Sequence, residues 1–429
     1  MITFVLFLFF LFLLLIGIPV GFSLAIAGGV GMVFTVGIDK LLVSLPNIMY
    51  GSLNNFTLIA IPLYVLMGNI MIRCKLSDEI YDILNEFVGH LSGGMAIATV
   101  LFCTVFAAIS GSSVATAATV GMIVLPEMLR LGYQRKFIFG LTAAGGTLGI
   151  LIPPSLNFIL YGALTEVSVG KLFIAGIVPG LILSAMFLIY AIVFSSINRY
   201  KSDRRPAWGR RIRALRRGFW SILIIPLIMV GIYTGVFTAT EAAGAGVVYA
   251  LAVSIAKKRI SVRDLEHVLL DTLKTSCMIL IIIIGAMIFG YVVTVLQFPQ
   301  QVMSLMTESQ VTPLQFLIAS FLLMLFLGCF VECVTIMVIL TPILYPLVLN
   351  LKIDPIWFGV FMTVNMELAL ITPPVGLNLF VINTIVPDSK LGEVYWGVWP
   401  FIIIMIVFLI LLYLFPIMAI WLPGMMVTK

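Results

Sequence analysis

The chain has 429 residues, of which 62% are apolar and only 10% are charged, with a formal net charge of +6. Its mean hydropathy of +1.22 lies far outside the range of soluble globular domains and is typical of helical membrane proteins with many crossings. At about 20 apolar residues per crossing, most of the chain is expected in the bilayer. The positive charge gathers in short loops, where it sets topology, so no nucleic-acid partner is expected.

The first half, residues 1–197, reads as apolar spans interrupted by more polar segments. The first span lacks a basic start and a small-residue cleavage site, so we expect it to be retained. Residues 77–90 alternate acidic and apolar faces, which predicts a helix along the membrane surface. We expect spans at 1–20, 22–37, 56–72 and 171–197, surface helices at 39–55 and 77–90, and two interrupted apolar stretches at 93–129 and 137–165.

The two interrupted stretches are the most informative part of the chain. The first breaks at Ser110-Gly-Ser-Ser113, and the second breaks from Gly145-Gly146 through Gly149 to Pro153-Pro154. Hydrocarbon cannot satisfy free backbone groups, so broken backbone at membrane depth is expected only inside protein or beside a watery cavity. Two such breaks close together indicate the binding site of a transporter.

Residues 198–218 carry nine Arg and Lys against one Asp, and we expect a basic cytoplasmic loop there. The second half, 219–429, then resumes the pattern. Pro313–Leu349 carries Glu332 at its middle, and Pro355–Ile385 carries Asn365, Glu367 and a proline pair. We expect spans at 219–236, 239–256, 275–296 and 395–422, surface helices at 261–274 and 298–310, a hairpin at 313–349 and a broken helix at 355–385.

The two halves repeat each other with an offset of 220. Pro126 falls on Pro346 and Pro153-Pro154 on Pro373-Pro374; after one inserted residue, Asn157 falls on Asn378. If 93–129 were a full crossing, the basic residues at its two ends would face opposite sides. A re-entrant hairpin puts them all in the cytoplasm, and the same count puts the second hairpin on the other face. The sequence therefore predicts two inverted repeats whose hairpin tips meet near the midplane, with both termini outside.

Each tip and its broken helix offer carbonyls and hydroxyls for a hard cation such as Na⁺, and helix N-termini for a carboxylate. With one cation site per tip, at least two Na⁺ are expected to move with each substrate. Serine and glycine in membrane helices also serve simply for close packing, so packing stays open as the alternative for these positions. Sodium site 1 is predicted at Ser110, Ser112, Gly149, Ile152 and Pro154; site 2 at Glu332, Cys333, Ala369, Thr372 and Pro374; and the substrate site at Ser113, Gly146, Asn157, Thr335 and Asn378.

Several polar residues allow two interpretations. Intramembrane Glu332 and Glu367 are costly unless paired or hydrated, which favours a function, although a structural bond to a serine or to backbone would also hold them. Asn157 and Asn378 either cap the half-helices after their proline pairs or touch substrate. Glu241 opens a span, where a carboxylate also serves as an N-terminal helix charge.

Other chemistries have little support in this sequence. The two histidines, His90 and His267, are far in sequence from the breaks, and the five cysteines show no CxxC spacing. No GxxxxGK[ST] motif is present, so ATP is not the expected drive. We therefore expect no enzyme activity and no cofactor, with Na⁺ as the coupling ion.

A set of motifs runs along the whole chain: Ile109-Ser-Gly-Ser-Ser-Val-Ala-Thr-Ala-Ala-Thr-Val-Gly121, Leu125-Pro-Glu-Met128, Gly146-Thr-Leu-Gly-Ile-Leu-Ile-Pro-Pro-Ser155, Ala175-Gly-Ile-Val-Pro-Gly180, Thr240-Glu-Ala-Ala243 and Thr372-Pro-Pro-Val-Gly-Leu-Asn-Leu-Phe380. Together these motifs resemble one family, the large membrane (M) subunit of tripartite ATP-independent periplasmic (TRAP) transporters. The resemblance implies an elevator-type secondary transporter of the bacterial inner membrane, coupled to Na⁺. It also implies a periplasmic substrate-binding (P) protein, a small four-helix membrane (Q) subunit, and an organic acid such as a C4-dicarboxylate or sialic acid as substrate.

Two other interpretations remain for the same sequence. A stand-alone ion-coupled carrier of related inverted-repeat fold would need no receptor protein. A channel or a membrane scaffold would have no need for two broken hairpins with matching prolines, which favour a carrier.

Overall fold

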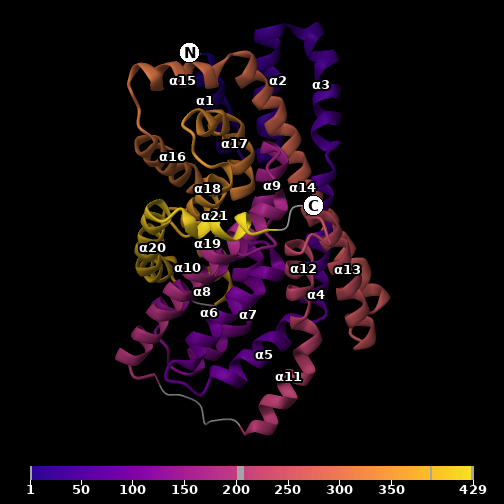
Figure 1. The fold of residues 1–429 in the computed structure, drawn as a ribbon, viewed down its shortest axis with the longest axis vertical. Helices are drawn as coiled ribbons and strands as arrows, with labels where there is room; N and C mark the ends of the chain where they lie inside the picture. The colour runs from indigo at the N-terminus through magenta and orange to yellow at the C-terminus, as the bar shows by residue number, and fades with distance from the viewer. Residues whose placement is uncertain (1, 201–206, 387–388, 427–429) are drawn as a thin grey trace.

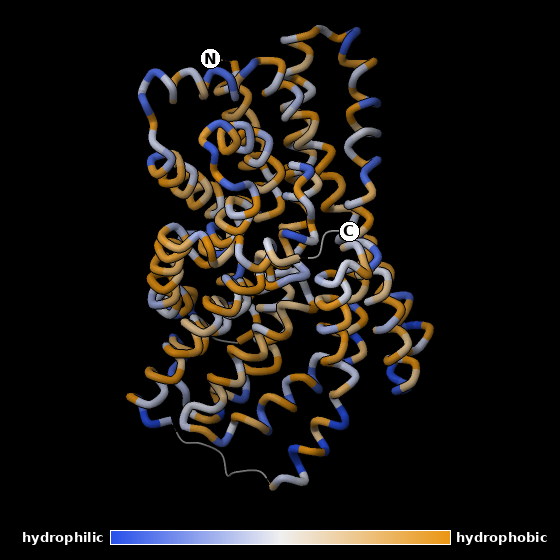
Figure 2. Tube along the Cα trace, in the orientation of Figure 1, coloured by the Kyte–Doolittle hydropathy of each residue, from blue (hydrophilic) through white to orange (hydrophobic). Residues whose placement is uncertain are grey.

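A computed structural model describes residues 2–200, 207–386 and 389–426, and these fold into helices without any strand (Figure 1). Within these residues, seven helices are long and apolar enough to cross a bilayer, and eight if a pair bent by 44° counts as one crossing. The expected all-α, multi-pass membrane class is thereby confirmed. Figure 2 shows apolar residues along most helices and a hydrophilic segment, α11, at one end of the long axis.

The first half runs from α1 to α10. Its elements are α1 (Ile2–Leu15), α2 (Val20–Val36), α3 (Ile38–Leu53), η1 (Phe56–Ile59), α4 (Ala60–Arg73), α5 (Leu76–Val88), α6 (Gly94–Ser110), α7 (Ser113–Arg130), α8 (Arg135–Thr147), η2 (Leu148–Ile150), α9 (Leu156–Thr165) and α10 (Val169–Ile197).

The second half runs from α11 to α21. Its elements are α11 (Trp208–Ile222), α12 (Ile224–Tyr233), α13 (Ala239–Ala256), α14 (Val262–Val295), α15 (Phe298–Glu308), α16 (Pro313–Gly328), α17 (Cys333–Asn350), α18 (Pro355–Leu370), α19 (Leu377–Ile385), α20 (Leu391–Leu414) and α21 (Ile417–Gly424).

The two series of helices correspond at the offset read from the sequence. Shifted by 220, the bounds of α7 become those of α17, and both Pro153-Pro154 and Pro373-Pro374 are cis peptides between half-helices. The packing is reciprocal as well: α2 packs along α14 and α13 along α4, while α9 packs on α17 and α19 on α7. Each hairpin therefore rests on the broken helix of the other half.

Three segments differ from the expectations. The stretch 198–218 is not a loop throughout, because Trp208–Ile222 is helical; arginine is a good helix former, and the apolar residues recur at helical spacing. Of this stretch, residues 201–206 lie outside the described part of the chain. The segments 261–274 and 275–296 form one continuous helix, α14, since neither glycine nor proline separates them. Finally, α3 runs beside α2 and α14 (Figure 1) rather than across their ends.

A buried acid holds the surface helix α5 to the second half. The Glu79 carboxylate is 2% exposed. It accepts a hydrogen bond from Ser221 Oγ at 2.6 Å and forms an ion pair with Arg259 Nη2 at 2.9 Å. Lys257 pairs with the same carboxylate, and Arg217 Nε lies 3.6 Å from it. A buried carboxylate is stable only when paired and hydrogen-bonded, so this cluster, which we call the Glu79 clamp, ties α5 to α11 and to the end of α13.

Candidate functional site

The two hairpin tips, 220 residues apart in sequence, line the same cavity of about 330 Å³. One wall belongs to the hairpins and the broken helix of the first half, and the opposite wall belongs to α4 and α14. The lining residues include Ser110, Gly111, Ser112, Ser113, Ile150, Leu156 and Asn157 of the first half, Glu332, Cys333 and Val334 of the second tip, and Gly68, Asn69, Thr275, Met278 and Ile279 of the facing wall.

The first tip holds a compact group of hydroxyls. α6 ends at Ser110 and α7 starts after Ser112, whose Oγ accepts the Ala115 N–H at 3.4 Å as an N-cap. The Ser110 and Thr116 hydroxyls lie 2.5 Å apart, and Thr116 Oγ1 donates to Ser112 O at 2.8 Å. Three oxygens of the kind that a hard cation prefers thus lie together at the tip.

The first tip touches the break in its partner helix. Leu156 N donates to Gly111 O at 3.4 Å, which joins the tip to the start of α9. A Cβ atom at Gly149 would lie 2.6 Å from both Ser112 O and Thr116 Oγ1, and one at Gly111, which has φ of +60°, would lie 2.9 Å from Pro154 O. Only glycine allows this approach without a shift of the backbone.

Most of the residues predicted for sodium site 1 therefore lie close together. The structure brings Ser110, Ser112, Gly149 and Pro154 into one group, whereas the side chain of Ile152 lies against Gly180 of α10. Thr116 also belongs to this group, although it is not among the residues predicted for site 1. The available signal was its position one turn after Ser112, at the start of the same helix.

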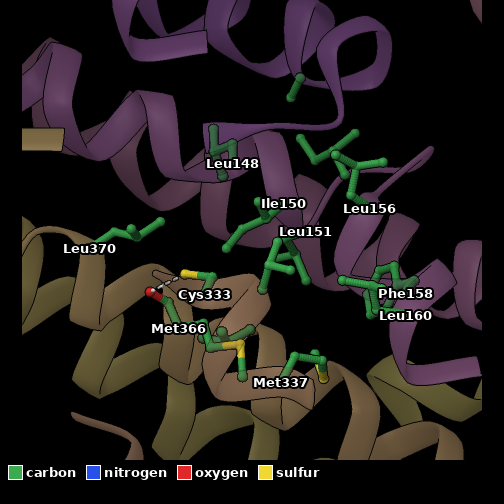
Figure 3. Close-up of a cluster of buried hydrophobic side chains, with 14 of the residues drawn as sticks. Leu148, Ile150, Leu151, Leu156, Phe158, Leu160, Cys333, Met337, Met366 and Leu370 are labelled. Atoms are coloured by element: carbon green, nitrogen blue, oxygen red, sulfur yellow. Dashed lines mark hydrogen bonds between the residues drawn. The ribbon is translucent and has the colours of Figure 1, made fainter. Parts of the chain in front are cut away.

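The second tip has a different composition. Glu332 is the N-cap of α17, half-buried, and its side chain makes no capping hydrogen bond. The Cys333 thiol donates to Met366 O at 3.6 Å (Figure 3), and Figure 3 places Ile150 and Leu151 of the first broken helix facing Cys333 and Met337. The second tip is therefore an acid beside a sulfur-rich apolar cluster.

The remaining residues of predicted site 2 have other partners. Ala369 packs on Gly328, where an added Cβ would lie 2.2 Å from the Ala369 Cβ. The Thr372 hydroxyl, just beyond the end of α18, donates to Leu368 O of that helix at 2.7 Å, and Tyr395 donates to Pro374 O. Of this predicted set, only Glu332 and Cys333 line the cavity.

Two of the five predicted substrate residues, Ser113 and Asn157, line the cavity. Asn378 instead donates its Nδ2 to Ser113 Oγ at 2.7 Å and to Ala143 O at 3.0 Å, so it braces the first tip from behind. Gly146 lies in the α7–α8 contact, where an added Cβ would be 2.6 Å from the Ala117 Cβ. Thr335 is fully buried, and within the described residues its hydroxyl has no partner.

The facing wall adds residues that the sequence did not indicate. Asn69 of α4 donates its Nδ2 to Thr272 Oγ1 of α14 at 3.0 Å, and Asn69 and Thr275 both line the cavity. Neither sits at a break or in a motif, so only the packing of α4 against α14 shows that they face the tips.

Glu367 is not among the residues that line the cavity, and it lies in the last turn of α18. It is fully buried, and within the part of the chain that the structure describes neither carboxylate oxygen has a hydrogen-bond partner. The serine or backbone bond considered as an alternative for Glu367 is therefore not present among the described residues.

Helix hairpins, paired broken helices and a shared cavity that contains polar groups of both tips define a multi-pass membrane transporter. The model of the family "Tripartite ATP-independent periplasmic transporter, DctM component" matches residues 7–418. The chain belongs to this family, which confirms the resemblance read from its motifs.

Relatives in the family differ in what their names say they carry. The C4-dicarboxylate TRAP transporter large permease protein DctM of Pseudomonas aeruginosa is 41% identical over 88% of both chains. The sialic acid permease SiaM of Vibrio cholerae is 31% identical over 97% of both chains. The ectoine permease TeaC of Halomonas elongata is 31% identical, over 96% of this chain and 97% of TeaC. These relatives are named as transporter permeases.

The fold also resembles a transporter of distant sequence. The crystal structure of the YdaH transporter of Alcanivorax borkumensis, described as having an unusual topology, superposes with a TM-score of 0.59. It is 16% identical and covers 89% of this chain and 88% of its own, so the likeness concerns the fold alone.

Proposed function

We propose that this chain is the permease subunit through which an organic acid enters the cell across the inner membrane, driven by Na⁺. The observation that carries the proposal is the shared cavity, in which the hydroxyl cluster of the first tip and Glu332 of the second face Asn69 and Thr275. Hydroxyls and carbonyls suit Na⁺, and the N-termini of α7 and α17 at the tips suit a carboxylate.

The substrate would cross from one side of the membrane to the other along the boundary between the two hairpins and the wall formed by α4 and α14. A second cavity of about 510 Å³ lies further along α14, between Ile283 and Thr294, and is bordered by α3 and the end of α9. The two cavities adjoin consecutive stretches of one helix, which supports an elevator movement of the hairpins and broken helices along α4 and α14.

A C4-dicarboxylate is the substrate that we propose first, because the 41% identical relative carries that name. As in that relative's family, a periplasmic binding protein would deliver the substrate, and a small membrane subunit would complete the permease. The isethionate relative DctMQ is longer, since 98% of this chain aligns with 66% of it.

Uptake into proteoliposomes tests the proposal. The chain is reconstituted with its small subunit, a receptor protein is added, and labelled succinate, sialic acid, isethionate and ectoine are offered with and without a Na⁺ gradient. Na⁺-dependent succinate uptake that requires the receptor is the expected result. Uptake by the chain alone would instead indicate a stand-alone carrier, and uptake without Na⁺ would reject the coupling.

The dependence of uptake on the membrane potential reports how many Na⁺ ions move with each substrate. Moving one net charge across the membrane contributes about 2.3 kcal/mol per 100 mV. Two Na⁺ with a divalent succinate are electroneutral, so an imposed potential should leave uptake unchanged. Two Na⁺ with a monovalent acid carry one net positive charge, so a potential negative inside should accelerate that uptake.

A further inference from the structure

α11 carries an apolar stripe that the protein leaves open. Its members are spaced i, i+4, i+7 and i+11, which places them on one face of the helix. They are Trp208, Ile212, Leu215 and Phe219, with exposures of 70, 49, 43 and 49%. A stripe of this kind on the surface requires an apolar partner, because monomeric proteins rarely leave such faces in water.

The side of α11 next to this stripe is already occupied by α5. An added Cβ at Gly218 would lie 2.5 Å from Ile83 Cδ1, and Ser221 joins the Glu79 clamp. Arg211 Nε donates to Glu86 O at 3.2 Å. These contacts fix the rotation of α11, so the stripe points away from the protein.

The polar face of α11 is strongly basic. Arg210, Arg213 and Arg216 make no ion pair with any residue that the structure describes. Arg210 and Arg213 line a groove of about 310 Å³, whose other side is formed by residues of α5 that include Asp82 and Glu86. Arg211 stacks on Trp208, with its Cζ 5.1 Å from the ring centroid. The helix thus has arginines around an apolar stripe with aromatic residues, the composition of helices that lie in a bilayer interface.

The position of α11 identifies the surface it meets. The apolar α12 follows directly after a bend of 44°, so α11 ends where the chain enters the membrane. The basic residues of the Glu79 clamp gather at the same end of the molecule, which the positive-inside rule assigns to the cytoplasm. Anionic lipids in that leaflet attract basic segments.

We propose that α11 lies in the cytoplasmic leaflet, with its apolar stripe in the acyl chains and with Arg210, Arg213 and Arg216 bound to anionic phospholipid headgroups. Long arginine side chains reach headgroups from the polar face of an interfacial helix. Because α5 is fixed to α11, the lipid contact also holds the start of the first hairpin unit in place at the membrane surface.

Spin labels on the full chain test the placement of the stripe. With exposed Cys277 replaced by serine, a nitroxide is attached at Leu215→Cys or at Gly209→Cys, a position with open space around it. The chain is reconstituted in vesicles of equal parts phosphatidylcholine and phosphatidylglycerol. The label at 215 should be relaxed by oxygen and shielded from a water-soluble nickel chelate, and the label at 209 should show the reverse.

Two outcomes of this measurement overturn the proposal. Equal access of the nickel chelate to both labels would place α11 in water. Shielding of the label at 215 from both reagents after addition of the small membrane subunit would make the stripe a protein interface instead of a lipid one.

Native mass spectrometry tests the headgroup preference. The full chain, released from the mixed vesicles, should retain phosphatidylglycerol over phosphatidylcholine. The triple variant Arg210→Gln, Arg213→Gln, Arg216→Gln should lose about fivefold in phosphatidylglycerol affinity for each arginine removed. The matched control is Lys75→Gln, Lys258→Gln, Arg263→Gln, which removes the same charge at the same end of the molecule. Equal losses in both variants, or no preference in the native chain, would overturn the proposal.

Discussion

The first hairpin tip bonds its hydroxyls to its own backbone and to Thr116, whereas the second tip presents Glu332 without a capping bond. The surface helices that precede the two hairpins also differ in how much of their surface packs against the protein. α5 buries six residues and is fixed by the Glu79 clamp, while α15 buries only Pro299. The first tip and its surface helix are thus held by many bonds, several of them from the second half, whereas the second tip has an uncapped acid and a mostly exposed surface helix. If a cation binds at each tip, as we propose, it should change the second tip more than the first.

The largest effect is expected from removing the Glu79 clamp. Glu79→Gln leaves Lys257 and Arg259 facing a neutral amide in a buried position, and breaking a buried ion pair costs about 3 kcal/mol or more. Thermal unfolding in detergent micelles should show a clear loss of stability. Glu308→Gln on the exposed α15 is the control and should leave the transition unchanged. Equal unfolding temperatures for both variants would show that the two helices are held alike.

Gly149→Ala tests whether the first tip depends on close contact with its broken helix. The added Cβ would meet Ser112 O and Thr116 Oγ1 at 2.6 Å, and overpacking of this kind costs about 2 kcal/mol. We expect Na⁺-dependent uptake to fall by more than tenfold. Gly244→Ala in α13, with nothing within 4 Å, should keep full uptake. Normal uptake by the Gly149 variant would mean that the tip is free of this contact.

The two tips are compared directly by Ser112→Ala and Glu332→Gln. Loss of the Ser112 cap costs about 1 kcal/mol, and loss of a charged ligand about twice as much, because charge-assisted bonds are roughly twice as strong as neutral ones. The Na⁺ concentration for half-maximal uptake should therefore rise more for Glu332→Gln than for Ser112→Ala. A Hill coefficient near one in the native chain, with normal Na⁺ dependence in both variants, would contradict a cation site at each tip.

The smallest effect concerns the start of α14. Ser261 and Arg73 donate hydrogen bonds to Asp264 and hold the pKa of its carboxyl below the usual range. A lowered folded-state pKa gives stability that is present above the unfolded pKa and lost as the pH falls through the folded value. Asp264→Asn should therefore slightly lower the unfolding temperature at neutral pH, and the difference should vanish well below about pH 4. A difference that persists in acid would point to packing instead.

Much of this architecture follows from patterns that the sequence displays openly. The breaks at Ser110–Ser113 and at the two proline pairs stand out because glycine, serine and proline interrupt long apolar stretches. The repeat offset then predicts α7 and α17 with corresponding bounds. Glu332 was identified because an acid inside an apolar stretch is rare.

The rest depends on packing between distant segments, which local patterns do not encode. Asn69 and Thr275 face the cavity only because α4 packs against α14. The sequence allows either a capping role or a substrate-binding role for Asn378. In the structure its side-chain amide instead donates a hydrogen bond to Ser113 of the other half. The many arginines of α11 predict a loop, although its apolar residues recur at helical spacing.

The Glu79 clamp also bears on how the chain is made. α5 is synthesised early, yet the cations that neutralise Glu79 are Arg217, Lys257 and Arg259, between 138 and 180 residues later. Until the end of α13 leaves the ribosome, this carboxylate has to remain hydrated, so α5 has to stay at the membrane surface without its final packing. The first hairpin is thus fixed in place only when the second repeat has been made as far as Arg259, and a truncated chain that ends before Lys257 should be recognised as unfinished by cellular quality control.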